Sequence, residues 1–320
     1  MTQLKMRVAR KEREADGICS LELESIDGQA LPPFRAGAHI DFHLPGGLIR
    51  QYSLFGSPFD QRRYRIAVLL DANSRGGSKA VHESVHAGDE VIISSPRNHF
   101  PLVPSEKSIL IAGGIGITPM LCMAEELSVE GKAYDLHYCV RTANRAAFLG
   151  RLGAAPFVEN THVHFDDASG SQGPLDLDAL LAHPRQGVHL YVCGPSGLID
   201  SVVEGAKRHN WPDDHVHFEH FAPPPSSQKQ GGHGFEVRIA STGQTFLILP
   251  EESVAQVLAR NGIDIPVSCE QGVCGTCVTR VIEGEPDHRD LFLTEAEQAA
   301  NDCFTACCSR ARGPLLVLDL

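Results

Sequence analysis

The sequence has no long apolar segment, no basic stripe and no apolar leader. No run in its 320 residues approaches the roughly 18 apolar residues of a membrane-spanning helix. The N-terminal stretch MTQLKMRVARKEREADG lacks the apolar core of a secretory signal and is too rich in acidic residues for a transit peptide. A formal net charge of −12 leaves no basic excess to neutralise nucleic-acid phosphates. We therefore expect a cytoplasmic protein that binds neither membrane nor nucleic acid.

Internal repeats and long low-complexity tracts are also missing, and the clearest break in composition is a linker. The segment APPPSSQKQGGHG has three prolines followed by small and polar residues, without periodic apolar positions. We predict domains at 1–103, 104–222 and 233–320, joined by a linker at 223–232. Residues 233–320 contain 13 acidic and six basic residues, a net charge of −7, which favours either docking on a positive partner or simple solubility.

The apolar pattern differs between the three predicted domains. Residues 1–103 consist of short alternating runs separated by turns, with one helix-like stretch, SKAVHESVHAG, which predicts a small antiparallel β-barrel. From about residue 105, strand-like segments such as SILIAGG alternate with helix-like segments such as TPMLCMAEELSVEG. This alternation predicts a doubly wound, parallel α/β domain. The last domain offers strands FEVRIA, TFLILP and PLLVLDL around one helix, an α+β pattern.

Six of the ten cysteines fall in the C-terminal domain. Cys269, Cys274 and Cys277 have the spacing C-x4-C-x2-C, and Cys307 follows after 29 intervening residues. This spacing matches the ligands of a plant-type [2Fe-2S] cluster, in which two irons share four thiolates. We predict that these four cysteines are the metal ligands.

Two alternatives to this ligand set stay open. A structural zinc site also favours four thiolates, although zinc sites usually present two short cysteine pairs. For the fourth ligand, Cys308 is adjacent to Cys307 and Cys303 is a weaker candidate; the spacing alone prefers Cys307. Gly272 and Gly275 lie between the ligands, where the loop must turn sharply and direct N–H groups at sulfur.

Two glycine-rich turns in the α/β domain indicate a nucleotide site. In ILIAGGIGITPM an apolar strand runs into glycines and then into a helix, and in VCGP a second strand ends at a Gly-Pro turn. A helix N-terminus offers free N–H groups, and both turns lie at the carboxyl edge of a parallel sheet, where such sheets bind ligands. The candidate residues are Gly114, Gly116, Thr118 and Pro119 in the first turn, and Cys193, Gly194 and Pro195 in the second.

The barrel contains a candidate flavin site. Arg50, Tyr52 and Ser53 place a phosphate-pairing cation, an aromatic face and a hydroxyl on one strand, with Arg50 and Tyr52 on the same face. The loop SRGGSKA leads into a short helix and supplies Gly76, Gly77 and Ser78 for a phosphate. Together these motifs predict bound flavin mononucleotide.

Taken as a set, RQYS, RGGS, AGGIGITPM, CGP and SCEQGVCGTC with Cys307 resemble the phthalate dioxygenase reductase family. This family includes vanillate O-demethylase reductases and similar partners of Rieske non-haem iron oxygenases. The resemblance covers essentially the whole chain and implies a flavin barrel, a nicotinamide domain and a C-terminal β-grasp ferredoxin. It implies that NADH delivers a hydride to FMN, that the cluster receives single electrons, and that a separate Rieske oxygenase is the acceptor.

The resemblance also assigns roles by motif. Arg50, Tyr52 and Ser53 would contact the flavin ring and phosphate, and Cys193 would lie near the nicotinamide. Phe221, the last residue of HFEHF, is a candidate for shielding the flavin ring. Asp166 in FDD follows a strand, where a carboxylate would pair with ribose hydroxyls and favour NADH over NADPH. Arg141 and Arg145 nearby favour NADPH instead, and a helix cap or a solvated turn residue is the alternative role for Asp166.

Several expectations remain alternatives. No obvious segment accommodates an adenosine, which favours FMN over FAD. The acceptor could be a diiron hydroxylase or a haem monooxygenase instead of a Rieske oxygenase. A non-redox reading makes the C-terminal domain a zinc-binding interaction module. We expect a monomer.

Overall fold

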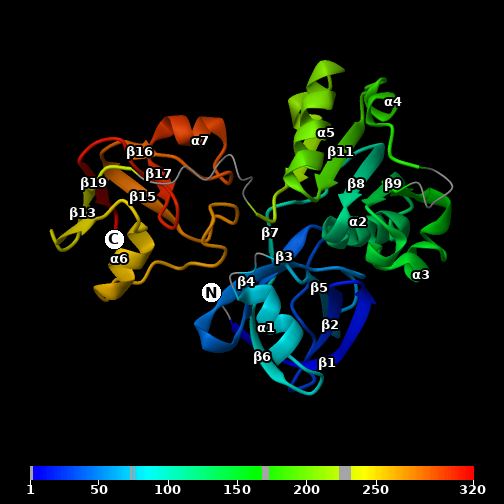
Figure 1. Ribbon diagram of the computed structural model, residues 1–320, viewed down its shortest axis with the longest axis horizontal. Helices are drawn as coiled ribbons and strands as arrows, with labels where there is room; N and C mark the ends of the chain where they lie inside the picture. The colour runs from blue at the N-terminus through cyan, green and yellow to red at the C-terminus, as the bar shows by residue number, and fades with distance from the viewer. Residues whose placement is uncertain (1–2, 73, 75, 168–172, 223–231) are drawn as a thin grey trace. The chain divides into compact units, whose positions relative to one another are not determined.

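The computed structural model describes the chain except for residues 1–2, 73, 75, 168–172 and 223–231 (Figure 1). Its residues form two compact units, Met1–Glu219 and His220–Leu320. Most of the predicted linker, 223–231, lies outside the described residues. Among the described residues, no helix is both long enough and apolar enough to cross a bilayer.

The N-terminal sheet is antiparallel and closes on itself. Its strands are β1 (Gln3–Ala15), β2 (Ile18–Ser25), β3 (Ala38–His43), β4 (Ile49–Ser53), β5 (Arg63–Leu69), β6 (Glu90–Ser94) and β7 (Arg97–Asn98). They follow the order β4-β3-β6-β1-β2-β5, with β7 paired to β3. A bridge between Leu54 and Ile66 joins the end of β4 to β5. The predicted antiparallel barrel is confirmed.

Residue alternation explains why these strands enclose a core. On β1, Met6 and Val8 are buried, whereas Lys5 and Arg7 are exposed. Helix α1 (Gly77–Ser84) adds its buried Val81 to the same core. Strand β1 therefore buries one face in the barrel core and leaves the other polar, whereas β3 has five consecutive buried residues.

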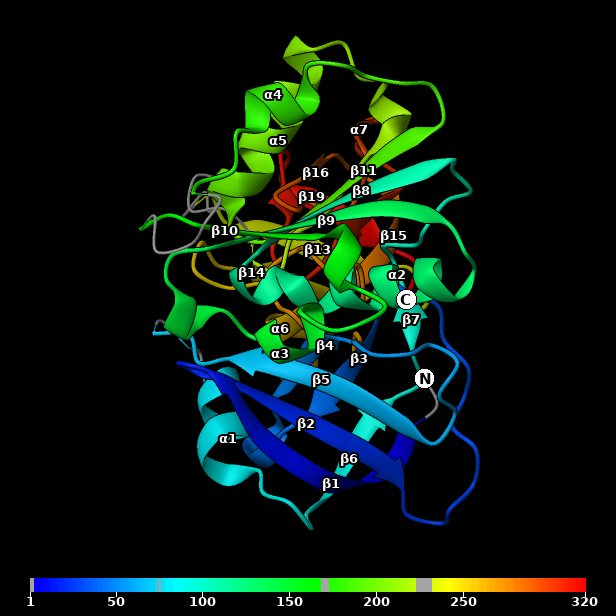
Figure 2. The ribbon, with the colours of Figure 1, turned by 90° about the vertical axis from the view of Figure 1, so that its right-hand side faces the viewer.

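The second sheet is parallel throughout. Its strands are β8 (Lys107–Gly113), β9 (Ala133–Val140), β10 (Thr161–Phe165), β11 (Val188–Cys193) and β12 (Val216–Glu219), in the order β10-β9-β8-β11-β12. Helix α2 (Ile117–Val129) covers one face, and α4 (Leu177–Leu181) and α5 (Ser196–Arg208) cover the other (Figure 2). On β8, Leu110 packs in the α2 core and Ile111 in the α5 core. This is the predicted doubly wound domain.

The barrel and the parallel sheet pack together within the first unit. The carboxylate of Glu126 on α2 is 1% exposed and accepts hydrogen bonds from Arg35 Nε at 2.8 Å and from the Ala36 N–H at 2.8 Å. The Tyr191 hydroxyl of β11 accepts the Val103 N–H at 2.9 Å. These contacts hold α2, and the glycine-rich turn before it, in place against the barrel.

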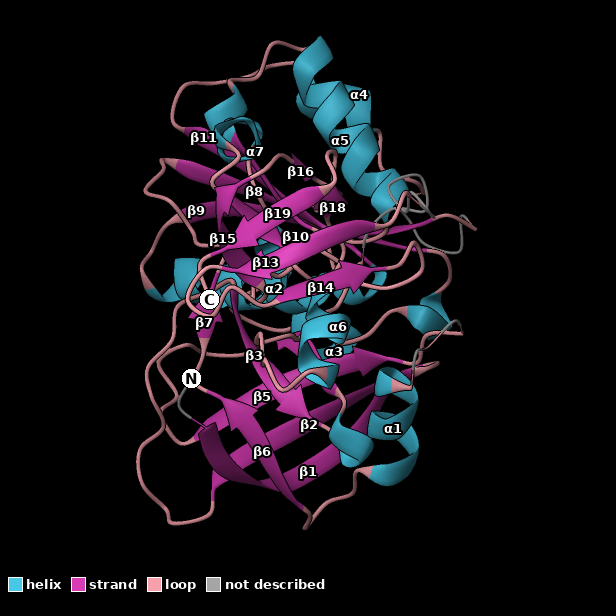
Figure 3. Ribbon diagram, turned by 90° about the vertical axis from the view of Figure 1, so that its left-hand side faces the viewer, coloured by secondary structure: helices cyan, strands magenta, loops and turns pink. Residues whose placement is uncertain are grey.

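The second unit is a mixed sheet with helices α6 (Val254–Arg260) and α7 (Glu295–Ala300) (Figure 3). Its strands are β13 (Phe235–Ile239), β14 (Thr245–Ile248), β15 (Val278–Glu283), β17 (Cys303–Thr305) and β19 (Leu315–Leu318), in the order β14-β13-β19-β15-β17. A small sheet pairs β16 (Pro286–Asp287) with β18 (Arg310–Ala311). Helix α6 starts at a Ser253–Gln256 capping box and buries Val254 and Leu258. The predicted α+β domain is confirmed.

Candidate functional site

The cysteine loop lies between α6 and β15. Cys269, Cys274 and Cys277 are each at most 7% exposed, and Cys307 is half-buried just after β17. The thiol of Cys269 is hydrogen-bonded to those of Cys274 and Cys307, and Cys307 is also hydrogen-bonded to Cys277. The fold therefore brings the four predicted ligands together.

The arrangement of these thiols fits a two-iron cluster. Contacts run from Cys274 to Cys269, from Cys269 to Cys307 and from Cys307 to Cys277, so the four thiols form one group that would supply two ligands to each of two irons. The shared hydrogen bonds lower the pKa of Cys269, which accepts them, and raise the pKa values of Cys274 and Cys307, which donate them.

Glycine is required at two points of this loop. Gly272 and Gly275 have φ of +74° and +68°. A Cβ on Gly272 would lie 2.5 Å from the Cys308 sulfur and 2.9 Å from the Asp290 Cα, and one on Gly275 would lie 2.2 Å from the Phe292 ring. The loop can wrap this tightly only because both side chains are absent.

Cys308 lies beside the ligand group. Its sulfur is 3.2 Å from the Thr305 hydroxyl oxygen and packs against Gly272. Cys307 contacts thiols from both ends of the loop, whereas Cys308 is hydrogen-bonded to the Cys307 thiol. This difference favours Cys307 as the ligand.

The predicted flavin residues lie on β4. Arg50 and Tyr52 stand opposite Phe42 and Ile40 in the β3–β4 register, so both project to the same side of the strand. Tyr52 is half-buried and packs edge-on against Phe42 with ring centroids 6.2 Å apart. Burial raises the pKa of the Tyr52 phenol, which keeps it protonated.

The side chain of Arg50 crosses the start of helix α1. A Cβ on Gly77 would lie 2.5 Å from the Arg50 Cγ, so the arginine can lie here only against a glycine. Gly76 precedes the helix with φ +90°. The Ser78 hydroxyl donates to Ser74 at 2.9 Å and accepts the Asp71 N–H. The structure thus places a guanidinium beside a helix N-terminus, which suits a phosphate.

The carboxyl end of β12 meets the flavin strand. The Ser53 hydroxyl donates to the Glu219 carboxylate at 3.4 Å, and Glu219 pairs with Cys193 in the β11–β12 register. Burial raises the pKa of Glu219 to about 8, against a smaller opposing effect of the Ser53 hydrogen bond. Burial and the nearby Glu219 also raise the pKa of Cys193. One carboxyl group therefore lies between a predicted flavin residue and a predicted nicotinamide residue.

The two glycine-rich turns pack directly on each other at the carboxyl ends of β8 and β11. A Cβ on Gly116 would lie 2.2 Å from the Cys193 carbonyl oxygen, and one on Gly194 would lie 2.8 Å from the Gly113 Cα. Pro195 precedes α5 at its N-cap position. Two of the predicted nucleotide glycines are therefore needed for turn-to-turn packing, a role that the motif did not reveal.

The remaining predicted residues of the nucleotide and flavin sites are partly buried and partly exposed. The Thr118 hydroxyl donates to the Ile115 carbonyl at 3.1 Å, and Pro119 is buried in α2. Asp166 is exposed at the carboxyl end of β10. Phe221 follows β12 by two residues and is 38% exposed.

Comparisons with known proteins cover almost the entire chain. Residues 237–312 match the model of the 2Fe-2S iron-sulfur cluster binding domain. The vanillate O-demethylase oxidoreductase of Pseudomonas sp. strain HR199 is 54% identical, over 96% of each chain. A solved phthalate dioxygenase reductase is 38% identical with a TM-score of 0.78, covering 99% of this chain and 98% of its own. The chain belongs to this family of oxygenase reductases.

The reductase is an oxidoreductase that uses NADH, FMN and a [2Fe-2S] cluster and transfers electrons to an oxygenase. The resemblance seen in the motifs is confirmed, and the match to the cluster domain decides against the zinc alternative. An intact type IV self-sufficient cytochrome P450 monooxygenase is also similar, at 39% identity and a TM-score of 0.84, over 99% of this chain and 41% of its own. The same architecture therefore occurs within a haem enzyme.

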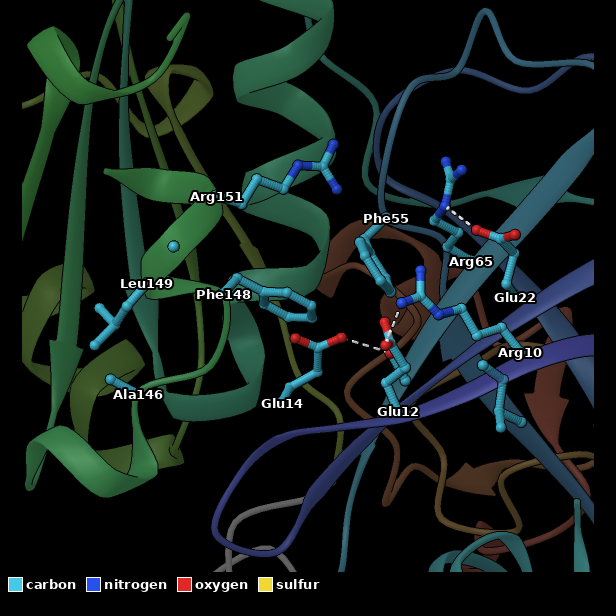
Figure 4. A pocket seen from close by; sticks show the side chains of 13 residues that line it. Arg10, Glu12, Glu14, Glu22, Phe55, Arg65, Ala146, Phe148, Leu149 and Arg151 are labelled. Carbon is cyan, nitrogen blue, oxygen red and sulfur yellow. Dashed lines mark hydrogen bonds and ion pairs between the residues drawn. The ribbon is translucent and has the colours of Figure 1, made fainter. Parts of the chain in front are cut away.

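A cavity of about 610 Å³ in the reductase lies away from these residues (Figure 4). It is lined by β1 and β2 of the barrel and by residues 146–151, and no predicted site residue borders it. Phe55 and Phe148 pack against each other in its wall, with ring centroids 4.8 Å apart. Its charges are largely satisfied by neighbours, such as Arg65 with Glu22 at 2.9 Å. The cavity therefore lies where the barrel packs against the parallel-sheet domain.

Sequence reasoning missed Glu219 as a site residue. Glu219 lies within HFEHF, a segment from which only the final phenylalanine, Phe221, was predicted to have a role. A signal was present, because Glu219 is the acidic residue of a strand otherwise made of Val, His and Phe. An acidic residue at the carboxyl end of a sheet strand is a candidate functional group.

Proposed function

We propose that the reductase donates electrons to a Rieske non-haem iron oxygenase that acts on an aromatic compound. The relative at 54% identity is named for vanillate O-demethylation, which supports an aromatic ether as the oxygenase substrate. The observation that carries the redox part is the Ser53–Glu219 contact beside Cys193. Hydride transfer needs flavin and nicotinamide side by side, and this contact joins the strands proposed to hold them.

In this proposal the barrel holds FMN. Arg50 pairs with the phosphate, and the backbone at Gly76, Gly77 and Ser78 offers N–H groups to it. Tyr52 and Ser53 lie along the flavin ring. When bound, FMN accepts a hydride from NADH, and the cluster carries single electrons.

The nicotinamide nucleotide is proposed to bind along the carboxyl edge of the parallel sheet. Its contacts are Gly114, Gly116, Thr118 and Pro119 at the first turn, Cys193, Gly194 and Pro195 at the nicotinamide, and Asp166 at a ribose. Because the Thr118 hydroxyl is already bonded to Ile115, its contact would come from the backbone. Phe221 is proposed to cover the flavin ring.

The cluster is proposed to bind Cys269, Cys274, Cys277 and Cys307, with Cys308 outside the ligand set. The proposed domains are 1–103, 104–222 and 233–320, with the linker at 223–232; the separate sheets of the structure support them. We further propose a cytoplasmic monomer, which sedimentation of the purified protein and fractionation of the source cells would test.

A haem acceptor is the second candidate, favoured by the similarity to the self-sufficient P450. Purified reductase, NADH and a methoxybenzoate should be combined with either a Rieske oxygenase or a P450 haem protein. We expect demethylated product in proportion to NADH consumed with the Rieske enzyme only. Coupled turnover with the haem protein alone would replace the Rieske proposal.

A further inference from the structure

Lys11 makes an unusual set of contacts with the end of helix α1. It lies on β1 and is half-buried, and its ammonium donates to the carbonyl oxygens of Val81 at 2.8 Å, His82 at 2.7 Å and Val85 at 2.7 Å. An ammonium has three N–H donors, so all three are used on one helix end. The contact spans about 70 residues of sequence.

These carbonyls are the groups that a helix leaves unsatisfied at its C-terminus. A cation there also interacts favourably with the negative end of the helix dipole. Helix α1 has eight residues, too few to be stable in isolation. Lys11, together with buried Val81 and the hydrogen bond of His82 Nε2 to the Val68 carbonyl at 2.9 Å, therefore fixes the position of this helix on the barrel.

The other end of α1 is the proposed phosphate cradle. Gly77 lies under the Arg50 side chain, and the N-cap residue Gly76 has no side chain to cap this N-terminus, where the Ser74 hydroxyl accepts the Lys79 N–H at 3.5 Å. An eight-residue helix is about 12 Å long, so the Lys11 ammonium lies at the opposite end from a phosphate bound there. Any effect of Lys11 on the phosphate must pass through the helix.

We infer that Lys11 is a positioning residue for the flavin phosphate: it fastens the C-terminus of α1 so that the N-terminal amides stay aligned with Arg50. This inference rests on the proposed FMN site. It predicts a specific loss, because the flavin ring is proposed to lie on β4 and only the phosphate meets α1. Lys11 should therefore matter for FMN and not for riboflavin, which has the same ring without the phosphate.

The test compares dissociation constants of FMN and riboflavin for flavin-free full-length protein, measured by quenching of flavin fluorescence. Lys11→Met is the main variant, and Lys5→Met, an exposed lysine on the same strand, is the matched control. We expect Lys11→Met to reduce the preference for FMN over riboflavin by about tenfold. Lys11→Arg should retain most of the preference, and Lys5→Met all of it.

Two failures are distinguishable. Equal affinity of the unaltered protein for FMN and riboflavin would overturn the phosphate cradle, and the role of Lys11 with it. A normal preference in the unaltered protein that persists in Lys11→Met, or an equal loss of both ligands, would overturn the role of Lys11 alone. Should Lys11→Met not fold, Lys11→Gln, which keeps two N–H donors without the charge, is measured by the same criteria.

Discussion

The cysteine loop and the proposed flavin–nicotinamide junction, formed by Ser53, Cys193 and Glu219, are assembled from the chain in different ways. Three of the four proposed cluster ligands come from nine consecutive residues, and the fourth, Cys307, follows after 29 further residues, just past β17. The junction instead combines Ser53 of the barrel with Cys193 and Glu219, from two strands of the parallel sheet. The first site is encoded locally, whereas the second exists only after two sheets have packed together.

This difference explains where strict residue requirements fall. In the loop they fall on thiols and on glycines with positive φ, which a spacing pattern displays directly. At the junction they fall on the contact between two turns, where Gly116 lies against the Cys193 carbonyl. We therefore expect a substitution at a cluster thiol to remove the cluster without unfolding the chain. A substitution where the two turns pack should instead lower the stability of the first unit.

The largest expected effect is at the adjacent cysteines. Cys307→Ser should abolish normal cluster assembly because it removes the thiol that contacts both Cys269 and Cys277. Cys308→Ser should retain the cluster, since its sulfur packs beside Thr305 and Gly272. Electron paramagnetic resonance of the reduced protein and acid-labile sulfide measure this. A cluster that survives in Cys307→Ser and is lost in Cys308→Ser would reverse the ligand assignment.

At the junction, Gly116→Ala should lower the free energy of unfolding of the first unit by about 3 kcal/mol, because the new Cβ overlaps backbone that cannot move aside. Urea unfolding followed by fluorescence of Trp211, the chain's single tryptophan, reports on this unit. Gly197→Ala is the matched control: the site has open space in helix α5, so stability should rise slightly. Equal stabilities of the two variants would contradict the packing role of Gly116.

The features that the sequence predicts are the locally encoded ones, and the features that it misses depend on long-range contacts. The barrel, the parallel sheet and the thiol group were predictable because strand alternation, strand-helix alternation and cysteine spacing are local patterns. The Glu219 carboxyl was not, because its importance comes from Ser53, more than 160 residues away. The packing role of Gly116 was hidden for the same reason, since the group that excludes a Cβ belongs to Cys193. Contacts between residues far apart in the sequence produce no local spacing pattern from which they could be predicted.

A smaller effect is expected at the contact that holds α2 to the barrel. Glu126 accepts from two donors, the Arg35 guanidinium and the Ala36 N–H. Glu126→Gln replaces one acceptor oxygen by a donor, so one of these bonds must be lost, and the first unit should become less stable by about 2 kcal/mol. Glu130→Gln, which removes only an exposed pair with Arg35, should change stability by less than about 0.5 kcal/mol. Indistinguishable Trp211 unfolding curves would show that the contact is dispensable.

The junction carboxyl is tested by its pH dependence. The pKa of Glu219 is raised from 4.5 to about 8, so between these values the folded protein keeps a proton that the unfolded chain releases. The contribution of this group to stability is therefore complete below about pH 4.5 and is lost as pH rises toward 8. The Glu219→Gln side chain cannot titrate, so this variant lacks the pH-dependent contribution of the carboxyl to stability.

The free energy of unfolding of flavin-free protein, followed at Trp211, should thus fall between pH 5 and pH 8 more steeply than in Glu219→Gln. Glu204→Gln, an exposed position on α5, should leave the slope of the unaltered protein unchanged. Parallel curves for the unaltered protein and Glu219→Gln would mean that the carboxyl titrates as it does in water. The junction would then be a packing contact between two sheets, without the protonated group that distinguishes it from the all-thiol cluster loop.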